Sequence, residues 1–184
     1  MLLAYYTPFA WRGIGRALFS PRISCYNIFN LSHKWVNSLE DLHILIVDDD
    51  LVTQKLLLRY LSPFGKCKAV SDGRSAIAAY ETAWAENHPF SLVCLDILLP
   101  EADGQEVLAS LRRIERKATE GGERKTYVAM ITAMGDMRNI SKAYRHRCDA
   151  YLVKPVSQKK LHQVLEKLFG PEILQRDLGS SDGS

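Results

Sequence analysis

Hydrophobic and polar residues follow a regular order along the chain from about residue 41 onward. Short runs rich in Val, Ile and Leu alternate with stretches whose apolar residues recur at helical spacing. The apolar runs predict five strands at about 43–47, 66–70, 91–95, 126–131 and 150–153. The periodic stretches predict five helices, at about 51–62, around 76–84, around 107–114, at about 136–147 and at about 157–169. Strands alternating with helices over short connections favour an α/β fold with a doubly wound, five-stranded parallel sheet.

The pattern also divides the chain into three parts. Residues 41–170 are expected to form one domain, and residues 171–184 a short polar tail with no output domain after it. Residues 1–40 show no sustained period, although they hold eight of the 17 aromatic residues. We interpret them as an atypical extension, disordered or the result of a start assigned upstream of Val36. The alternative is a basic, aromatic arm that contacts a membrane surface or a partner.

Charge and cysteine usage narrow the class of protein. Residues 1–40 carry a net charge of +3, whereas residues 41–184 carry 20 basic and 20 acidic residues. The folded part therefore has no basic field that would favour nucleic acid. Four scattered cysteines without a CxxC pair favour a reduced, cytoplasmic protein. No run approaches the roughly 18 apolar residues of a membrane span. Since the five histidines show no metal-ligand spacing, we expect them to be surface or packing residues.

Polar residues stand where four of the predicted strands end. Asp48 and Asp49 follow the first strand, Asp96 follows the third, Thr132 ends the fourth, and Lys154 follows the fifth. The carboxyl ends of parallel strands meet at one edge of the sheet, where open α/β sheets bind their ligands. This edge is therefore expected to gather carboxylates, a hydroxyl and an ammonium into a site for a divalent cation and a phosphoryl group.

Each of these groups has a chemical role in such a site. Mg²⁺ (or Mn²⁺) takes oxygen ligands, which Asp48, Asp49, Asp96 and the backbone carbonyl of Leu98 could supply. Asp96 is the natural nucleophile, because carboxylates form aspartyl-phosphates. Lys154 would hold the phosphoryl oxygens as a point charge, with Thr132 as a hydroxyl donor.

Two neighbouring residues are expected to have local structural roles. Asp50, directly ahead of a helix, is expected to be its N-cap. The Lys154–Pro155 bond is a candidate cis peptide that would aim the lysine.

Four segments together resemble the receiver domain of bacterial two-component response regulators: residues 44–50, 95–104, 131–133 and 151–155. The resemblance covers about residues 41–170 and implies a strand order of 2-1-3-4-5. It also implies that Asp96 accepts phosphate from a histidine kinase or a histidine phosphotransfer protein, with Asp48 and Asp49 in the magnesium site. Thr132 and Tyr151 resemble the family's switch pair. Such a protein is a phosphoacceptor and no enzyme beyond its own phosphorylation and dephosphorylation.

Three classes of function compete. The favoured one is a stand-alone receiver that relays a signal through protein contacts, or otherwise acts as a phosphorelay intermediate or phosphate sink. A haloacid-dehalogenase-like phosphatase would need a second aspartate at the position of Leu98. An unphosphorylated scaffold would have no need of the acidic edge. In the favoured class, the readout surface would be formed by residues 136–147, 150–153 and 157–169. Its basic residues are Arg138, Lys142, Arg145, Lys159 and Lys160.

Overall fold

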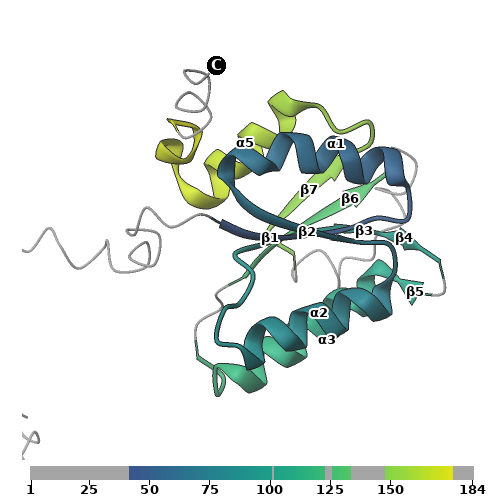
Figure 1. Cartoon of the computed structure of the whole chain (residues 1–184), viewed down its shortest axis with the longest axis vertical. Helices are drawn as coiled ribbons and strands as arrows, with labels where there is room; N and C mark the ends of the chain where they lie inside the picture. The colour runs from purple at the N-terminus through teal and green to yellow at the C-terminus, as the bar shows by residue number, and fades with distance from the viewer. Residues whose placement is uncertain (1–41, 101, 123–125, 134–147, 176–184) are drawn as a thin grey trace, which may run out of the picture. The chain divides into compact units, whose positions relative to one another are not determined.

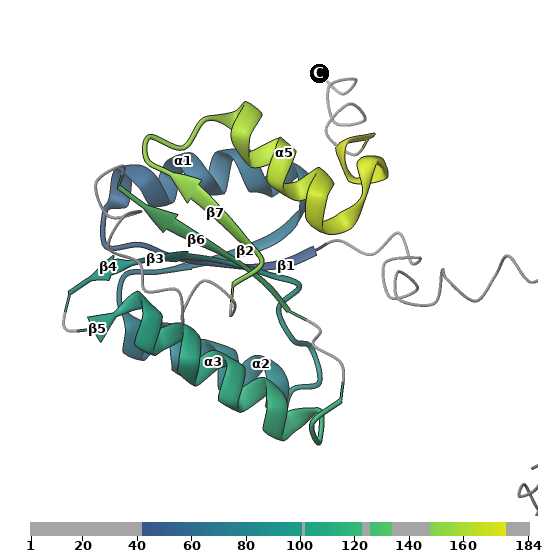
Figure 2. The same cartoon turned by 180° about the vertical axis from the view of Figure 1, so that it is seen from behind.

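A computed structural model describes residues 42–100, 102–122, 126–133 and 148–175 of the chain. These residues belong to one of two compact units, residues 38–184. A parallel five-stranded sheet has the order β2-β1-β3-β6-β7 (Figures 1 and 2). Its strands are β1 (Leu42–Val47), β2 (Gly65–Val70), β3 (Leu92–Asp96), β6 (Tyr127–Thr132) and β7 (Ala150–Val153). This confirms the predicted fold class and, counting these five strands in sequence, the order 2-1-3-4-5.

Helices cover both faces of the sheet. They are α1 (Leu51–Leu61), α2 (Gly73–Ala85), α3 (Gly104–Ala118) and α5 (Gln158–Phe169). Figure 1 shows α1 and α5 on one face, with α2 and α3 on the other. Each begins at a side chain that accepts hydrogen bonds from its first turn, which satisfies otherwise unpaired backbone donors. These caps are Asp50, Asp72, Asp103 and Ser157. The expected helix at 136–147 lies outside the described residues, as do residues 1–40.

Three details differ from the sequence-based expectation. Helix α3 continues to Ala118, two residues into the segment 117–125, whose paired glycines and charges predict an exposed loop. The sequence predicts a loop over 99–104, but there β4 (Leu98–Leu99) and β5 (Ala102–Asp103) pair as a short antiparallel hairpin that begins one residue earlier. Short 3₁₀ turns, η3 (Ser62–Phe64) and η5 (Pro171–Leu174), follow α1 and α5. Packing therefore continues past residue 170, because Ile173 in η5 is buried.

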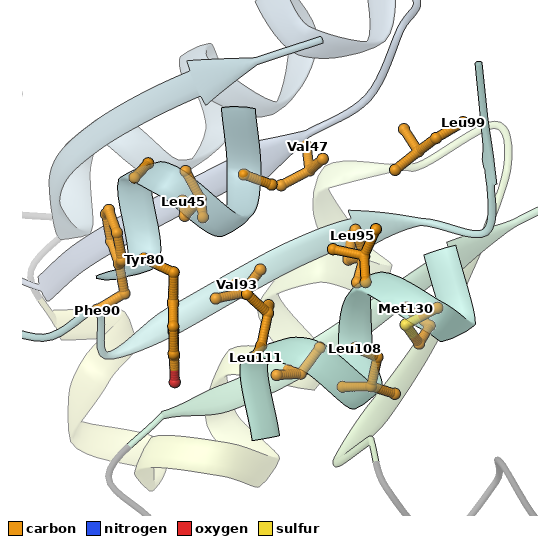
Figure 3. Packing of buried hydrophobic residues seen from close by; sticks show 14 of the residues in the cluster. Leu45, Val47, Tyr80, Phe90, Val93, Leu95, Leu99, Leu108, Leu111 and Met130 are labelled. Atoms are coloured by element: carbon orange, nitrogen blue, oxygen red, sulfur yellow. The ribbon is translucent and has the colours of Figure 1, made fainter. Parts of the chain in front are cut away.

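The core beneath α2 and α3 consists of alternate residues from the inner strands. Leu45, Val93 and Leu95 of the sheet pack in one cluster with Tyr80 of α2 and with Leu108 and Leu111 of α3 (Figure 3). Successive strand residues point to opposite faces, so a strand covered by helices on both sides must be apolar throughout. This explains why β1 and β3 are continuous apolar runs. No helix among the described residues has the length and apolar character needed to cross a membrane.

A buried polar cluster ties the amino ends of the strands to α3. Arg112 Nη1 donates to Glu115 Oε2 and to the Thr126 carbonyl, both at 2.8 Å. Arg112 Nη2 donates to Asp149 Oδ2 at 2.7 Å, and that oxygen also accepts from Val128 N at 2.8 Å. Because each charge is paired and hydrogen-bonded, these contacts offset the cost of removing the charges from water. The cluster fixes the end of the domain opposite the acidic edge.

Candidate functional site

Three carboxylates converge at the carboxyl ends of β1 and β3. One ligand oxygen from each of Asp48, Asp49 and Asp96 lies within 4.8 Å of the others. Asp48 and Asp96 are buried, whereas Asp49 is exposed. The parallel pairing of β1 with β3 produces this convergence, because the two strands end side by side. Among the described residues, this is the one group of three or more acidic, histidine or cysteine side chains placed to hold a metal ion.

Asp48 is held rigidly by its own loop and by α1. Its Oδ1 accepts from Asp50 N at 3.0 Å, while Asp50 caps α1 as expected. Gln54 Nε2 donates to the Asp48 carbonyl at 2.6 Å and to the Val70 carbonyl at 3.2 Å. Burial raises the pKa of Asp48, and the nearby charge of Asp96 acts in the same direction, against a hydrogen bond from Lys154. The surroundings of Asp48 therefore disfavour its charged form, and an added cation would stabilise that form.

Lys154 supplies a cation at the end of β7. Its ammonium bonds to Asp96 Oδ2 and lies 2.9 Å from Asp48 Oδ2. Burial alone would lower the pKa of Lys154, but the contacts with Asp96 and Asp48 outweigh it and raise the pKa. The Lys154–Pro155 peptide is cis, as expected from the sequence. A charged ammonium is thus kept against the carboxylate expected to be the nucleophile.

Thr132 and Tyr151 lie on the neighbouring strands β6 and β7. Thr132 is fully buried and its Oγ1 donates to the Ala133 carbonyl at 3.1 Å. Tyr151 is paired in register with Met130 and packs, half-buried, against the core beneath α2 and α3. Thr132 thus ends β6, as the sequence predicts, and Tyr151 lies on the strand next to it.

The segment after Asp96 turns sharply beneath the site. Leu98 N donates to Asp96 Oδ1 at 3.1 Å, and the Leu98 side chain is 62% exposed. Gly104 begins α3 so close to the strand that a Cβ there would lie 2.1 Å from the Asp96 carbonyl oxygen. Only glycine permits this approach, which lets α3 start directly under Asp96.

Sequence reasoning missed the roles of Gln54 and Gly104. Gln54 is buried on the same helical stripe as Leu57 and Leu61, spaced by three and four residues. A polar side chain on an apolar stripe is the signal that could have revealed it, since a buried amide needs partners. No comparable signal marks Gly104, because its constraint comes from a strand that is close only in the fold.

The donor set fits a hard divalent cation. Mg²⁺ prefers oxygen ligands, keeps several waters and needs only one or two carboxylates. Asp48, Asp49 and Asp96 supply those carboxylates, and their mutual repulsion is the physical reason to bind a dication there. The exposure of Asp49 leaves the site open to solvent.

Comparison with known proteins gives one consistent result. Residues 44–166 match the family described as the response regulator receiver domain. The probable histidine kinase 4 of Oryza sativa subsp. japonica is 30% identical over 144 residues, 70% of this chain and 14% of that protein. The probable transcriptional regulator ycf27 of Cyanophora paradoxa is 31% identical over 127 residues, 68% of this chain and 47% of that protein. The chain thus spans less than half the length of these curated relatives.

Solved structures show the same fold. The CheX-CheY-BeF3-Mg complex from Borrelia burgdorferi includes a chain that matches with a TM-score of 0.59 and 24% identity. The match covers 71% of this chain and 90% of that one. A CheY-like receiver domain protein from Methanospirillum hungatei JF-1 matches with a TM-score of 0.57 and 21% identity, over 77% of this chain and all of that one. At these identities the structures establish the fold alone.

Proposed function

Because the chain belongs to the family of response regulator receiver domains, we propose that Asp96 accepts a phosphoryl group from a histidine kinase or a histidine phosphotransfer protein. The observation that carries the proposal is the convergence of Asp48, Asp49 and Asp96 within 4.8 Å, with Lys154 bonded to Asp96. Receiver domains act in two-component signalling, so a phosphohistidine is the natural donor.

In the proposed reaction, a carboxylate oxygen of Asp96 attacks the phosphorus of the phosphohistidine. A new O–P bond forms as the P–N bond breaks, and the imidazole nitrogen of the donor keeps the electron pair. Lys154 is already at Asp96 and would follow the phosphoryl oxygens as a point charge. Thr132 would turn its hydroxyl from the Ala133 carbonyl to a phosphoryl oxygen.

Asp48, Asp49 and Asp96, with the Leu98 carbonyl, are the groups that would hold Mg²⁺. When bound, Mg²⁺ supplies positive charge that offsets the repulsion between the carboxylates and an incoming phosphoryl group. The residues' own contribution is to hold the donor oxygens in place, which the Gln54 and Asp50 contacts to Asp48 accomplish.

Incubation of the full chain with acetyl phosphate and Mg²⁺ tests the proposal. We expect one phosphoryl group per chain by intact mass, stable in acid and labile in base, and none in the presence of a chelator. Asp96→Asn should not be labelled. Asp103→Asn is the matched control, because asparagine caps a helix as well as aspartate does and Asp103 lies outside the acidic cluster.

The two outcomes against the proposal are distinct. Stoichiometric labelling of Asp96→Asn would show that another residue is the acceptor. An unlabelled wild-type chain with bound Mg²⁺ would favour the scaffold alternative.

We further propose that the signal is read out by protein contacts on β7, α5 and residues 136–147. Lys159 and Lys160 are exposed on α5 and suit an acidic partner segment. Arg138, Lys142 and Arg145 lie outside the described residues.

A further inference from the structure

Two histidines that are 45 residues apart in sequence meet at the amino end of the sheet. His43 belongs to β1, and His88 lies in the connection between α2 and β3. Their Nδ1 atoms are 3.0 Å apart, and His43 Nδ1 is also 3.0 Å from the His88 carbonyl oxygen. His43 Nδ1 thus lies beside two further atoms that carry lone pairs, the His88 ring nitrogen and the His88 carbonyl oxygen. This contact lies at the opposite end of β1 from Asp48.

We propose that His43 and His88 form a second metal site, selective for a divalent transition metal such as Zn²⁺. Imidazole nitrogen suits zinc, copper and nickel, whereas Mg²⁺ prefers oxygen. With metal–nitrogen bonds of about 2.0–2.1 Å, neighbouring ligand atoms lie about 3.0–3.4 Å apart. The two separations from His43 Nδ1 are already close to that spacing. The His88 carbonyl is available as a third ligand, with water completing the shell.

The ring of His43 is held in place before any metal arrives. Phe90 stacks on it with ring centroids 4.0 Å apart, and Phe90 is itself buried. The His43 backbone is bound to Ser91 on both sides: Ser91 N donates to the His43 carbonyl at 2.7 Å, and His43 N donates to Ser91 Oγ at 3.4 Å. His88 N donates to the Ala83 carbonyl at 2.9 Å, which anchors its loop to α2. Preorganised ligands cost little entropy to bind.

A proton on His43 Nδ1 competes with the metal for this nitrogen. A hydrogen on His43 Nδ1 can be donated to the His88 carbonyl and shared with His88 Nδ1. Burial lowers the pKa of His43 most, and the charges of His88 and Lys68 lower it further, against hydrogen bonds to the His88 and Pro89 carbonyls that raise it. The neutral ring is the form that binds metal. The positive charge of Lys68 repels a cation bound at His43, so removing this charge should strengthen metal binding.

The site can be observed directly by NMR of the imidazole nitrogens in the full chain. With excess Mg²⁺ present to occupy the acidic cluster, one equivalent of Zn²⁺ should shift the Nδ1 signals of His43 and His88 together. His88→Asn, an exposed loop substitution, should weaken Zn²⁺ binding roughly tenfold or more. Lys68→Gln should strengthen it roughly twofold or more, because an exposed positive charge is removed. His162→Gln on α5 should leave both shifts unchanged.

Three results would overturn the site. The first is that neither ring shifts at one equivalent of Zn²⁺, and the second is that only one does. The third is that His88→Asn binds Zn²⁺ as tightly as the wild type. Circular dichroism of each variant checks that it is folded. If His88→Asn does not fold, His43→Asn is used to remove the site instead.

Discussion

Lys154 Nζ lies 2.9 Å from Oδ2 of Asp48, while the same ammonium also bonds to Asp96. A single side chain that directly follows β7 thus offsets part of the negative charge of two carboxylates, one after β1 and one at the end of β3. The ammonium and a divalent cation compete for the same negative charge, so the two should be thermodynamically coupled.

Replacing Lys154 by methionine should therefore strengthen Mg²⁺ binding. It should also lower the free energy of unfolding of the metal-free domain. Removing one positive charge near the site corresponds to about 1 kcal/mol, or roughly fivefold in the dissociation constant. Isothermal titration calorimetry measures the affinity and urea unfolding measures the stability. Lys159→Met, on the exposed face of α5, is the control and should change neither. Weaker Mg²⁺ binding in Lys154→Met would mean that the ammonium positions the carboxylates and does not oppose the metal.

Beryllofluoride with Mg²⁺ should shift amide signals along β6 and β7, including Tyr151, in addition to those of the loops around Asp49 and Asp96. The Thr132 hydroxyl would leave the Ala133 carbonyl for the phosphoryl mimic, and Tyr151 on the neighbouring strand could move into the released space. Thr132→Ser should keep these shifts and Thr132→Ala should lose those at Tyr151. Shifts confined to the two loops in the wild type would refute this switch.

Tyr80→Phe should reduce the free energy of unfolding by about 1 kcal/mol near neutral pH. The Tyr80 hydroxyl donates to Thr126 Oγ1 at 2.9 Å, and that oxygen donates in turn to the Phe90 carbonyl at 2.7 Å. Losing a buried hydrogen bond typically costs about 0.5–1.5 kcal/mol. Urea unfolding at neutral pH measures the change, and no loss would show that this hydroxyl contributes nothing.

The Tyr80→Phe substitution should also reduce the loss of stability that occurs as the pH rises into the alkaline range. Burial raises the pKa of Tyr80 above its ordinary value of 10.0. The unfolded chain therefore loses this proton first, so the stability due to Tyr80 is present below pH 10.0 and is lost as the pH rises through the folded-state pKa. Above pH 10.0, the free energy of unfolding should fall less steeply with pH in Tyr80→Phe than in the wild type. Equal slopes in the variant and the wild type would contradict this.

Leu111→Ala should destabilise the domain by about 2–5 kcal/mol. Leu111 is fully buried between α3 and the sheet (Figure 3), so its truncation leaves a cavity that close-packed neighbours fill only in part. Val52→Ala is the contrasting control, because the Val52 side chain is 74% exposed and should cost less than about 0.5 kcal/mol. Similar losses for the two variants would show that the core beneath α3 is not close-packed.

Much of this fold could be predicted from the sequence because a sheet covered on both faces demands continuous apolar strands. The runs 43–47 and 91–95 carry that signature, and β1 and β3 lie there with shifts of one residue at their ends. The acidic edge followed from topology alone, since parallel strands that end in polar residues bring those residues together. Asp48 and Asp96 are neighbours for that reason.

Contacts set by the fold were harder to anticipate. No local spacing in the sequence indicates that His43 pairs with His88, because the two residues are 45 positions apart. We therefore expected both to be surface or packing residues. The clamp by Gln54 and the close approach of Gly104 likewise depend on segments that are distant along the chain. The hairpin of β4 and β5 is too short for a periodic pattern.

The sheet ends at β2 on one side and at β7 on the other. Edge strands expose unpaired backbone groups that can recruit a strand from another molecule and seed aggregation. β2 presents Lys66 and Lys68 as exposed side chains, and β7 is only four residues long. Charge on one edge and brevity on the other make both poor templates for strand addition. The alternating lysines of β2 are thus expected to disfavour self-association through this edge.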